Sequence, residues 1–356
     1  MTLLDTSVLP PPPAPLVIGV SGGGDSMALL HMAHEAGFRC RAVTVNHGLR
    51  AEANDEAAFV ARVCRDLGVL HETVEGNDPP DTGRPAWARN LRLRTLVNRA
   101  QAANATIALA HNADDQVETL RMRAARGGGT LGLSGIPLLA RLDGRLLVRP
   151  LLECRRDALR RWLGERGLEW IEDPSNTDTA YERNRRRMSA STLDDANILR
   201  LATLARRHRA ALMQRAARHI ENDLTVDHSV WTFAVDHLHA PALLTLRIVI
   251  ASAGGGRHLP SEPTLLRLLD EDAFTLGHCI VRRVGNTYRV RRENRGPSDE
   301  RRIGDDCLPW LEGPVPQSDW RIEEALRAKL DVRDGEEPSG ARAPRSRSEG
   351  SQDPTA

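Results

Sequence analysis

A glycine-rich segment, Ser21-Gly22-Gly23-Gly24-Asp25-Ser26, carries the clearest chemical signal in this 356-residue chain. It follows residues 15–20, an apolar stretch that predicts a buried strand, and precedes residues 27–34, which predict a helix. Glycines in such a turn leave backbone N–H groups pointing outward at the positive end of a helix dipole, which attracts phosphate. Ser26 is placed to cap the helix, and Asp25 offers a carboxylate where Mg²⁺ would bridge nucleotide phosphates.

The segment is not a Walker A loop, because no lysine follows its glycines. Taken as an isolated hexapeptide, it is also compatible with an ordinary strand–turn–helix connection.

A second run, His111-Asn-Ala-Asp114-Asp115-Gln-Val-Glu118-Thr119, follows a predicted strand and opens a predicted helix. Asp115 and Glu118 are three residues apart and Asp114 and Glu118 four, so these carboxylates share part of one helical surface. Such a cluster could hold a cation, either Mg²⁺ or an ammonium group. The alternative is acidic charge that complements the helix dipole, with Asp114 as a cap. His111, at a strand end, could contact phosphate or a base, or serve the structure alone.

Two arginine-rich segments add the opposite charge. Arg89 and Arg92 are three apart on a predicted helix and share a face, where they could stabilise negative charge developing on a transferred phosphoryl group. Four arginines occupy five positions in residues 183–187, a density that suits RNA or triphosphate binding. Both segments are also compatible with a solvated surface.

Elements that alternate between strand and helix must position these groups. Strands are predicted over 16–20, 42–45, 73–74, 106–110 and 146–148, and helices over 26–36, 54–67, 86–103 and 114–126. This alternation predicts an α/β fold, a parallel sheet with helices on both faces. Ligands bind such sheets beyond the carboxyl ends of the strands. The glycine loop, the segment after Asn46 and His111 should therefore converge on one edge.

The rest of the chain is expected to be a mainly helical C-terminal region. Residues 155–172 predict a helix, 191–222 a long arginine-rich helix or helical pair, 263–271 a short helix, and 279–292 a hairpin turning at Gly285-Asn286. The predicted organisation is a Pro-rich leader (1–15), an α/β domain (16–190), a mainly helical region (191–332) and a disordered tail (333–356).

Composition limits the class of protein. The formal charge of +1 excludes a uniformly basic surface, although all 49 basic residues except Lys329 are arginines. The five cysteines form no CxxC pair, which argues against a metal ribbon or a disulfide scaffold and for a reducing compartment. No apolar run approaches the roughly 20 residues needed to cross a bilayer. We therefore expect a cytoplasmic protein that does not bind membranes.

Together these runs resemble the tRNA(Ile)-lysidine synthetases, which are N-type ATP pyrophosphatases of the PP-loop superfamily. The matching segments cover roughly residues 16–190: 21–26, 46–50, Ala88-Arg89 with Arg92, 111–119, 132–135, 149–152 and 170–187. The resemblance implies ATP-dependent joining of free L-lysine to the wobble cytidine of a CAU-anticodon tRNA(Ile). The cytidine is first adenylated, and lysidine then forms with release of AMP and pyrophosphate.

The resemblance also implies roles for single residues. ATP would be bound by the loop and His111, with Mg²⁺ at Asp25, and the ammonium groups of lysine by Asp115 and Glu118. Arg89 or Arg92 would stabilise the adenylation transition state or position the cytidine. Arg183 and Arg187 would contact RNA or the triphosphate. The family's C-terminal domains help to bind tRNA, so the 191–332 region is expected to do so here, and a homodimer is one option for the assembly.

The sequence departs from the family at three places. Leu93 stands where the family has an aromatic residue, Met188 where it has a histidine, and residues 190–356 match weakly.

Three other functions compete with this one. A tRNA thiolation enzyme would need reactive or cluster-binding cysteines, and an amidating enzyme such as an NAD or GMP synthetase would leave residues 170–187 unexplained. A binding protein that kept the fold would bind ATP or RNA without releasing AMP.

Overall fold

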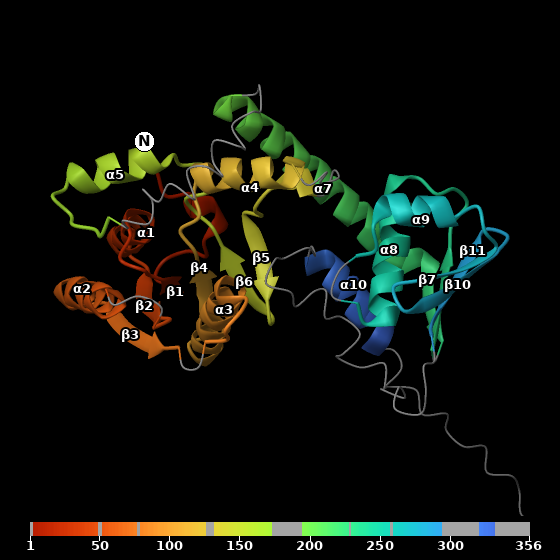
Figure 1. The fold of residues 1–356 in the computed structure, drawn as a ribbon, viewed down its shortest axis with the longest axis horizontal. Coiled ribbons are helices and arrows are strands. Elements are labelled where there is room, and N and C mark those ends of the chain that lie inside the picture. Colours follow the sequence, from red (N-terminus) through yellow and green to blue (C-terminus); the bar gives the residue numbers. More distant parts are fainter. Residues whose placement is uncertain are drawn as a thin grey trace, which may run out of the picture.

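The structure, a computed structural model, describes residues 3–48, 52–76, 79–125, 132–172, 194–227, 229–256, 259–293 and 320–331. Within these ranges the chain forms an α/β unit and a smaller unit with its own sheet, joined by the long helix α7 (Asp195–Asp223) (Figure 1). The predicted tail from 333 lies outside the described residues.

The first sheet has six strands in the order β3-β2-β1-β4-β6-β5. All neighbouring pairs are parallel except β5 with β6, which forms an antiparallel edge. The strands are β1 (Pro15–Gly19), β2 (Arg39–Asn46), β3 (Leu70–Glu75), β4 (Thr106–Ala108), β5 (Leu139–Leu142) and β6 (Arg145–Val148). The predicted parallel sheet is therefore confirmed, with one added edge strand.

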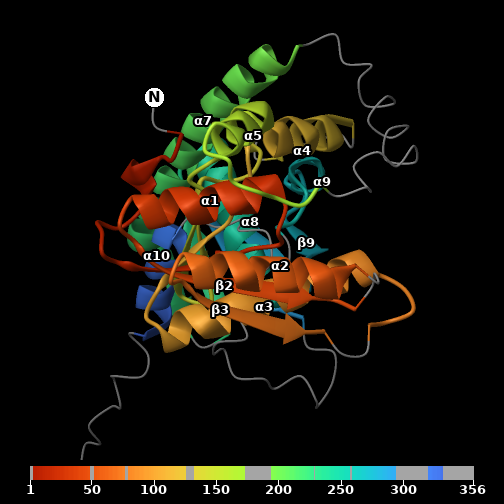
Figure 2. The same cartoon turned by 90° about the vertical axis from the view of Figure 1, so that its left-hand side faces the viewer.

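Helices cover both faces of this sheet. The helices α1 (Gly24–Glu35), α2 (Ala53–Asp66) and α5 (Arg156–Gly164) share one core with it, and α3 (Arg84–Ala102) packs on the opposite face. Figure 2 shows α1 beside α5, with α3 on the far side of the strands. Leu16 and Ile18 of the central strand enter the first core and Val17 enters the second, so this strand is apolar throughout.

The strand order reverses beside β1. From β1 the chain adds β2 and then β3 on one side, whereas β4 and β6 lie on the other. The crevice beyond the carboxyl ends of β1 and β4 is therefore the switch point, where a parallel sheet binds ligands. The glycine loop leaves β1 there and His111 follows β4 there, as the sequence predicts.

The first residues of the chain belong to the α/β unit, which corrects the prediction of a separate Pro-rich leader. The short helix η1 (Thr6–Val8) lies between Leu4 and Leu9, whose side chains are buried in the core of α1 and α5. The N–H of Asp5 donates to the carbonyl oxygen of Pro150. Apolar anchors on both sides of the helix therefore hold this segment in place.

A helical layer at the edge of the α/β unit connects it to α7. It consists of α4 (Ala113–Ala125) and η2 (Gly132–Ser134), both of which contact α7. Val117 and Leu120 pack against Ile198 and Ala202 of α7. Arg121 adds an ion pair with Asp195, with 2.9 Å between Nη2 and Oδ1.

The second unit is built on a five-stranded antiparallel sheet of order β7-β8-β11-β10-β9. Its strands are β7 (Leu224–Asp227), β8 (Val230–Ala234), β9 (Ala273–Leu276), β10 (Cys279–Val284) and β11 (Thr287–Arg292). Its helices are α8 (Ala240–Gly254), α9 (Glu262–Leu268) and α10 (Trp320–Asp331). The predicted hairpin is confirmed as β10–β11, and the other three strands are additions to it. Together with the end of α7, the three helices and the sheet bury Trp231 and Phe233 in one core.

No helix in the described part of the chain is both long and apolar enough to cross a membrane.

Candidate active site

The glycine loop is braced by its own serines. The Ser26 hydroxyl donates to the carbonyl oxygen of Gly23 at 2.9 Å and accepts from the N–H of Ser21 at 3.2 Å. Gly23 precedes the first turn of α1 without a side-chain cap, so the prediction that Ser26 caps this helix is wrong. Ser26 lies inside the helix and fixes the loop from within, while the N–H groups of the first turn stay available for an anion.

A segment far along the chain explains why the loop needs glycines. The N–H of Ile171 donates to the carbonyl oxygen of Gly22 at 2.9 Å. A Cβ on Gly22, whose φ is +86°, would meet the Ile171 side chain at 2.8 Å, and one on Gly24 would meet Trp170 at 3.3 Å. Close approach of residues 170–171 thus favours glycine at positions 22 and 24 even before a ligand is considered, whereas a Cβ on Gly23 would make only an ordinary contact with Ser21.

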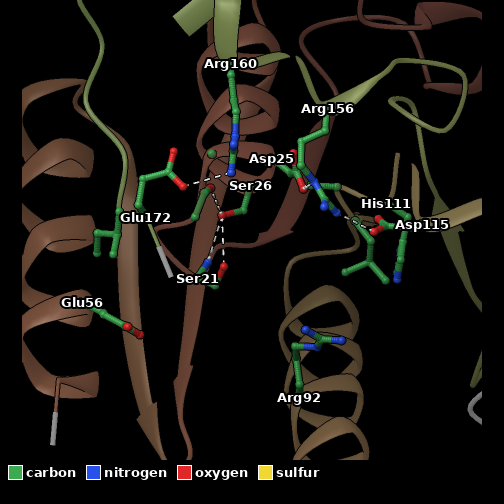
Figure 3. A pocket seen from close by; sticks show the side chains of 15 residues that line it. Ser21, Asp25, Ser26, Glu56, Arg92, His111, Asp115, Arg156, Arg160 and Glu172 are labelled. Atoms are coloured by element: carbon green, nitrogen blue, oxygen red, sulfur yellow. Dashed lines mark hydrogen bonds and ion pairs between the residues drawn. The ribbon is translucent and has the colours of Figure 1, made fainter. Parts of the chain in front are cut away.

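Arg156 at the start of α5 bridges the two carboxylates that the sequence assigns to different ligands. Its Nε lies 3.3 Å from Asp25 Oδ2 and its Nη2 lies 3.0 Å from Asp115 Oδ1. Figure 3 shows the three side chains meeting above the loop. Burial raises the pKa of both carboxyl groups, and the charge of Arg156 opposes that rise. Sequence reasoning missed Arg156, since nothing in its local pattern marks it.

A reciprocal pair of hydrogen bonds at the start of α4 fixes the position of Asp115. The N–H of Asn112 donates to Asp115 Oδ2 at 3.0 Å, and the N–H of Asp115 donates to Asn112 Oδ1 at 3.1 Å. Glu118 lies on the next turn and adds to the rise in the pKa of Asp115, but it is not among the residues that line the pocket. The acidic pair is therefore present, with only Asp115 facing the cavity.

Basic groups without acidic partners gather on the opposite side, and among them Arg92 lines the pocket. Arg89 and Arg92 of α3 make no ion pair or hydrogen bond within the described residues, and the Nε of Arg92 is buried without a partner. Burial lowers the pKa of both guanidinium groups. Arg149 follows β6, is 2% exposed and donates to the carbonyl oxygen of Pro137 at 2.7 Å. Burial and the charge of Arg89 lower its pKa to about 9. Uncompensated cations at one place indicate an anion site.

His111 is held as a neutral donor on this side. The Nε–H of Arg149 donates to its Nδ1 at 3.3 Å, so the ring proton must reside on Nε2. Burial, followed by the charges of Arg149, Arg92 and Arg89, lowers the pKa of His111 to about 3. His111 therefore offers the pocket one N–H and no charge near neutral pH.

Except for Arg89, Arg149 and Glu118, the charged groups described above line one pocket at the switch point (Figure 3). Its wall includes Ser21, Gly23, Gly24, Asp25, Ser26, Arg92, His111, Asp115, Arg156, Arg160 and Glu172. A second, adjoining hollow lies beyond β1 and β2 and is lined by Val45, His47, Ala53 and others. Arg92 lines both cavities, whereas Arg89 lines neither of them. The structure therefore distinguishes two arginines that the sequence alone could not tell apart.

Comparison with known proteins agrees with this geometry. Residues 4–193 match the family of PP-loop domains. A tRNA(Ile)-lysidine synthase from Ruegeria pomeroyi is 37% identical over 310 residues, which is 79% of this chain and 72% of that protein. One from Hyphomonas neptunium is 32% identical over 290 residues, 75% of this chain and 78% of that protein. This chain belongs to the tRNA(Ile)-lysidine synthase family.

Membership in the tRNA(Ile)-lysidine synthase family makes the chain an enzyme of that type. The match with the Ruegeria protein is longer than the PP-loop domain, so the similarity continues beyond residue 193. The match with a tRNA(Ile)-lysidine synthase from a Bradyrhizobium species is shorter. The two sequences are 42% identical over 206 residues, which is 55% of this chain and 58% of that protein.

Solved structures resemble the chain only distantly. A U34-tRNA thiolase from Methanococcus maripaludis with an iron–sulfur cluster has a TM-score of 0.47 and 17% identity, covering 58% of this chain and 76% of that one. Similarity at this level says nothing about function.

The departures from the family can be partly located. Leu93, in place of the aromatic residue, is 5% exposed and packs in the core between α3 and the sheet, where an apolar side chain is what the site requires. Met188 lies outside the described residues, as do Arg183, Arg187, Leu49 and Arg50. The proposed RNA or triphosphate contacts of Arg183 and Arg187 stay predictions.

The environment of His111 predicts a pH dependence of stability. Its pKa is lowered from 6.5 to about 3, so the unfolded chain binds a proton that the folded chain rejects. The contribution of neutral His111 to the free energy of unfolding is therefore complete above about pH 6.5. As the pH falls below that value, this contribution decreases by up to about 1.4 kcal/mol per pH unit. Between about pH 6.5 and 4, the free energy of unfolding in urea should depend less on pH in His111→Gln than in the wild type. The difference should correspond to up to one fewer proton taken up on unfolding.

Nitrogen-15 spectra of labelled histidine give a direct check. At pH 6 the Nδ1 of His111 should carry no proton and its Nε2 should carry one. An unchanged stability slope in His111→Gln, together with a protonated Nδ1 in the wild type, would contradict this assignment.

Proposed function

We propose that this enzyme joins free L-lysine to the wobble cytidine of a CAU-anticodon tRNA(Ile) at the expense of ATP. In the first step the carbonyl oxygen of cytosine attacks the α-phosphorus of ATP, and pyrophosphate leaves. In the second step an amine of lysine attacks the activated ring carbon, loses a proton, and displaces AMP to leave lysidine. The observation that carries this proposal is that a phosphate-binding loop, the carboxylates of Asp25 and Asp115, and Arg92, an arginine without an acidic partner, line one pocket.

The loop and the two cavities suggest how ATP lies. Phosphate oxygens would accept from backbone N–H groups at the start of α1, with the serine-braced loop holding its shape. The hollow beyond β1 and β2, which is less polar, would take the nucleoside. His111, fixed as an N–H donor, would bind a phosphate or base oxygen without adding charge.

Mg²⁺ fits this site as an ion shared with the nucleotide. Asp25 Oδ1 is buried in the described structure without a hydrogen-bond partner. The described residues contain no group of three or more His, Cys, Asp or Glu that could hold a metal by itself. One carboxylate plus substrate phosphates is a typical Mg²⁺ environment, and the ion would neutralise charge on the triphosphate. Asp25 would hold it at the phosphate end of the pocket.

Asp115 suits the ammonium of lysine. Its Oδ2 is taken by the backbone, and its Oδ1 faces the cavity, where an ammonium group can donate a charge-assisted hydrogen bond. Glu118, one turn away, would strengthen the negative field. A lysine held here would lie beside the phosphates, close to where an adenylate forms.

Arg92 is the better placed of the two arginines for the adenylation step. It lines both cavities, so its guanidinium lies between the nucleoside and phosphate ends. Negative charge that develops on the α-phosphate would be stabilised by a donor that is preorganised and only weakly solvated. Arg89, behind it, would support the positive potential.

The four described cysteines, Cys40, Cys64, Cys154 and Cys279, do not support sulfur transfer. None lines the pocket, and burial raises the pKa of the Cys40 and Cys279 thiols to about 12 and of Cys64 to about 11. Thiols held in this state are poor nucleophiles.

The second unit offers a surface for the tRNA backbone. Arg282 of β10 lies directly opposite Arg289 of β11, and Arg291 lies further along the same outward face. Like charges in cross-strand register are unfavourable for the sheet, and these three form no ion pair within the described residues. Phosphates would relieve that repulsion. In Figure 1 this sheet lies at the far end of the molecule from the loop, so it would contact RNA remote from the modified base.

The first experiment is AMP release from labelled ATP with purified protein, CAU-anticodon tRNA(Ile) and lysine, each omitted in turn. Release that needs the tRNA, and a lysine-sized mass gain on the wobble cytidine when lysine is present, are expected. Thiolated product would point to sulfur transfer, and ATP binding without AMP would point to a binding protein. Asp115→Asn should raise the KM for lysine about tenfold or more while RNA adenylation continues.

Replacing Arg92 should act on the first chemical step. Arg92→Gln is expected to lower the rate of cytidine adenylation about 10²–10³-fold, the usual cost of removing one preorganised donor. Arg94→Gln, two residues further on the same helix and exposed, is the matched control and should adenylate normally. Equal rates for the two variants in single-turnover adenylation would show that Arg92 does not face the reacting phosphate.

The arginine face should affect binding rather than chemistry. Combining Arg282→Gln, Arg289→Gln and Arg291→Gln should raise the KM for tRNA and leave kcat near the wild-type value. The slope of log affinity against log salt should become shallower by about two to three. Arg267→Gln, exposed on α9 outside this face, serves as the control. Unchanged salt dependence in the triple variant would remove this surface from the tRNA-binding site.

A further inference from the structure

Arg156 occupies the one oxygen of Asp115 that a ligand can use. Asp115 Oδ2 already accepts from the N–H of Asn112, and its own N–H donates back to Asn112 Oδ1, so the carboxylate cannot turn without breaking the start of α4. Oδ1 points into the pocket and accepts from Arg156 Nη2 at 3.0 Å. A lysine ammonium that binds Asp115 must therefore displace or share with this guanidinium.

The same guanidinium also occupies Asp25. Its Nε lies 3.3 Å from Asp25 Oδ2, on the carboxylate proposed to meet Mg²⁺ and the nucleotide. One planar group thus spans the nucleotide end and the lysine end of the pocket. With two carboxylates around it, Arg156 is held more firmly than either contact alone would hold it.

The backbone of Arg156 is fixed, whereas its side chain lies partly exposed in the cavity. Its backbone N–H donates to Asp114 Oδ2 at 2.8 Å, which ties the first turn of α5 to the start of α4. Its side chain is 31% exposed and lines the cavity together with Gly23 and Gly24. The guanidinium can therefore turn toward phosphates on the loop while the helix stays in place.

Nucleotide binding changes the balance of these contacts. When Asp25 is engaged by Mg²⁺ and ATP, Arg156 loses one of its two carboxylates and gains phosphate oxygens within reach. Guanidinium groups bind phosphate with two parallel hydrogen bonds, which favours the turn. The turn uncovers Asp115 Oδ1.

We propose that Arg156 couples the two substrate sites, blocking Asp115 until nucleotide draws it away, so that lysine binds after ATP. This inference rests on the proposed function, since it assigns an order to the two substrates. Coupling of this kind is a free energy that acts equally in both directions, so lysine should also tighten nucleotide binding by the same factor.

The test is calorimetric titration of lysine into the full-length enzyme, with and without Mg²⁺ and α,β-methylene-ATP, whose α–β bond cannot be cleaved. In the wild type the analogue should lower the Kd for lysine at least tenfold, about 1.4 kcal/mol of coupling. Without nucleotide, Arg156→Gln should bind lysine more tightly than the wild type does. In this variant the Kd for lysine without the analogue, divided by the Kd with it, should approach one.

Arg155→Gln is the matched control. Arg155 precedes Arg156 and pairs with Asp114 and Asp195 instead of Asp25 and Asp115, so this variant should keep the wild-type ratio. If the wild-type Kd for lysine is the same with and without the ATP analogue, the inference is overturned, whatever the variants show. The inference is also overturned if Arg156→Gln keeps the wild-type ratio of the lysine Kd without the analogue to that with it, or if this variant binds lysine more weakly than the wild type in both states. Absence of lysine binding by the wild type in both states would instead contradict the proposed function.

Discussion

The reversal of strand order beside β1 is the constraint on which the site depends. Parallel strands bring their carboxyl ends to one edge, and the reversal opens a crevice between β1 and β4 at that edge. The glycine loop and His111 lie in this crevice because each directly follows one of those strands. The helices α1 and α4 then begin at the same edge, so their N-termini and the carboxylates of their first turns face one pocket.

Within that pocket, the carboxylates of Asp25 and Asp115 lie apart from Arg92, a cation without an acidic partner among the described residues. Asp25 and Asp115 lie with Arg156 on the side of α5, whereas Arg92 belongs to α3 on the opposite face of the sheet. His111 lines the pocket, and Arg149 donates a hydrogen bond to its ring from outside the lining; burial and neighbouring arginines, with no carboxylate, lower the pKa of both groups. A cation and a polyanion can therefore bind side by side, which is what joining an amine to an adenylated base requires.

The long helix α7 ties this chemistry to the rest of the molecule. Its first residue, Asp195, pairs with both Arg121 and Arg155, and Arg155 also pairs with Asp114 beside the acidic site. The far end of α7 is buried in the core of the second unit. One helix with one end beside the pocket and the other in the arginine-bearing unit would connect the proposed RNA contacts of that unit physically to the site.

The sequence by itself determined the elements and the local chemistry. Periodicity and apolar runs predicted the parallel sheet and the β10–β11 hairpin, and local spacing predicted the glycine loop, Asp25, His111 and Asp115, because each of these signals lies within a few adjacent residues. It could not separate Arg89 from Arg92, since both share one helical face, and it misplaced the cap at Ser26.

The sequence marked residues 149–152 and 170–187 only as segments that match the family; the tertiary structure alone brought in Arg156 and showed what Arg149 and Trp170 contact. Arg156 is 131 residues from Asp25 in the chain, and Arg149 is 38 from His111. Their roles come from helix packing and strand order, so no local pattern could reveal them. The same is true of the pKa values, because burial at the switch point, rather than residue type, keeps His111 neutral and leaves the arginines in need of an anion.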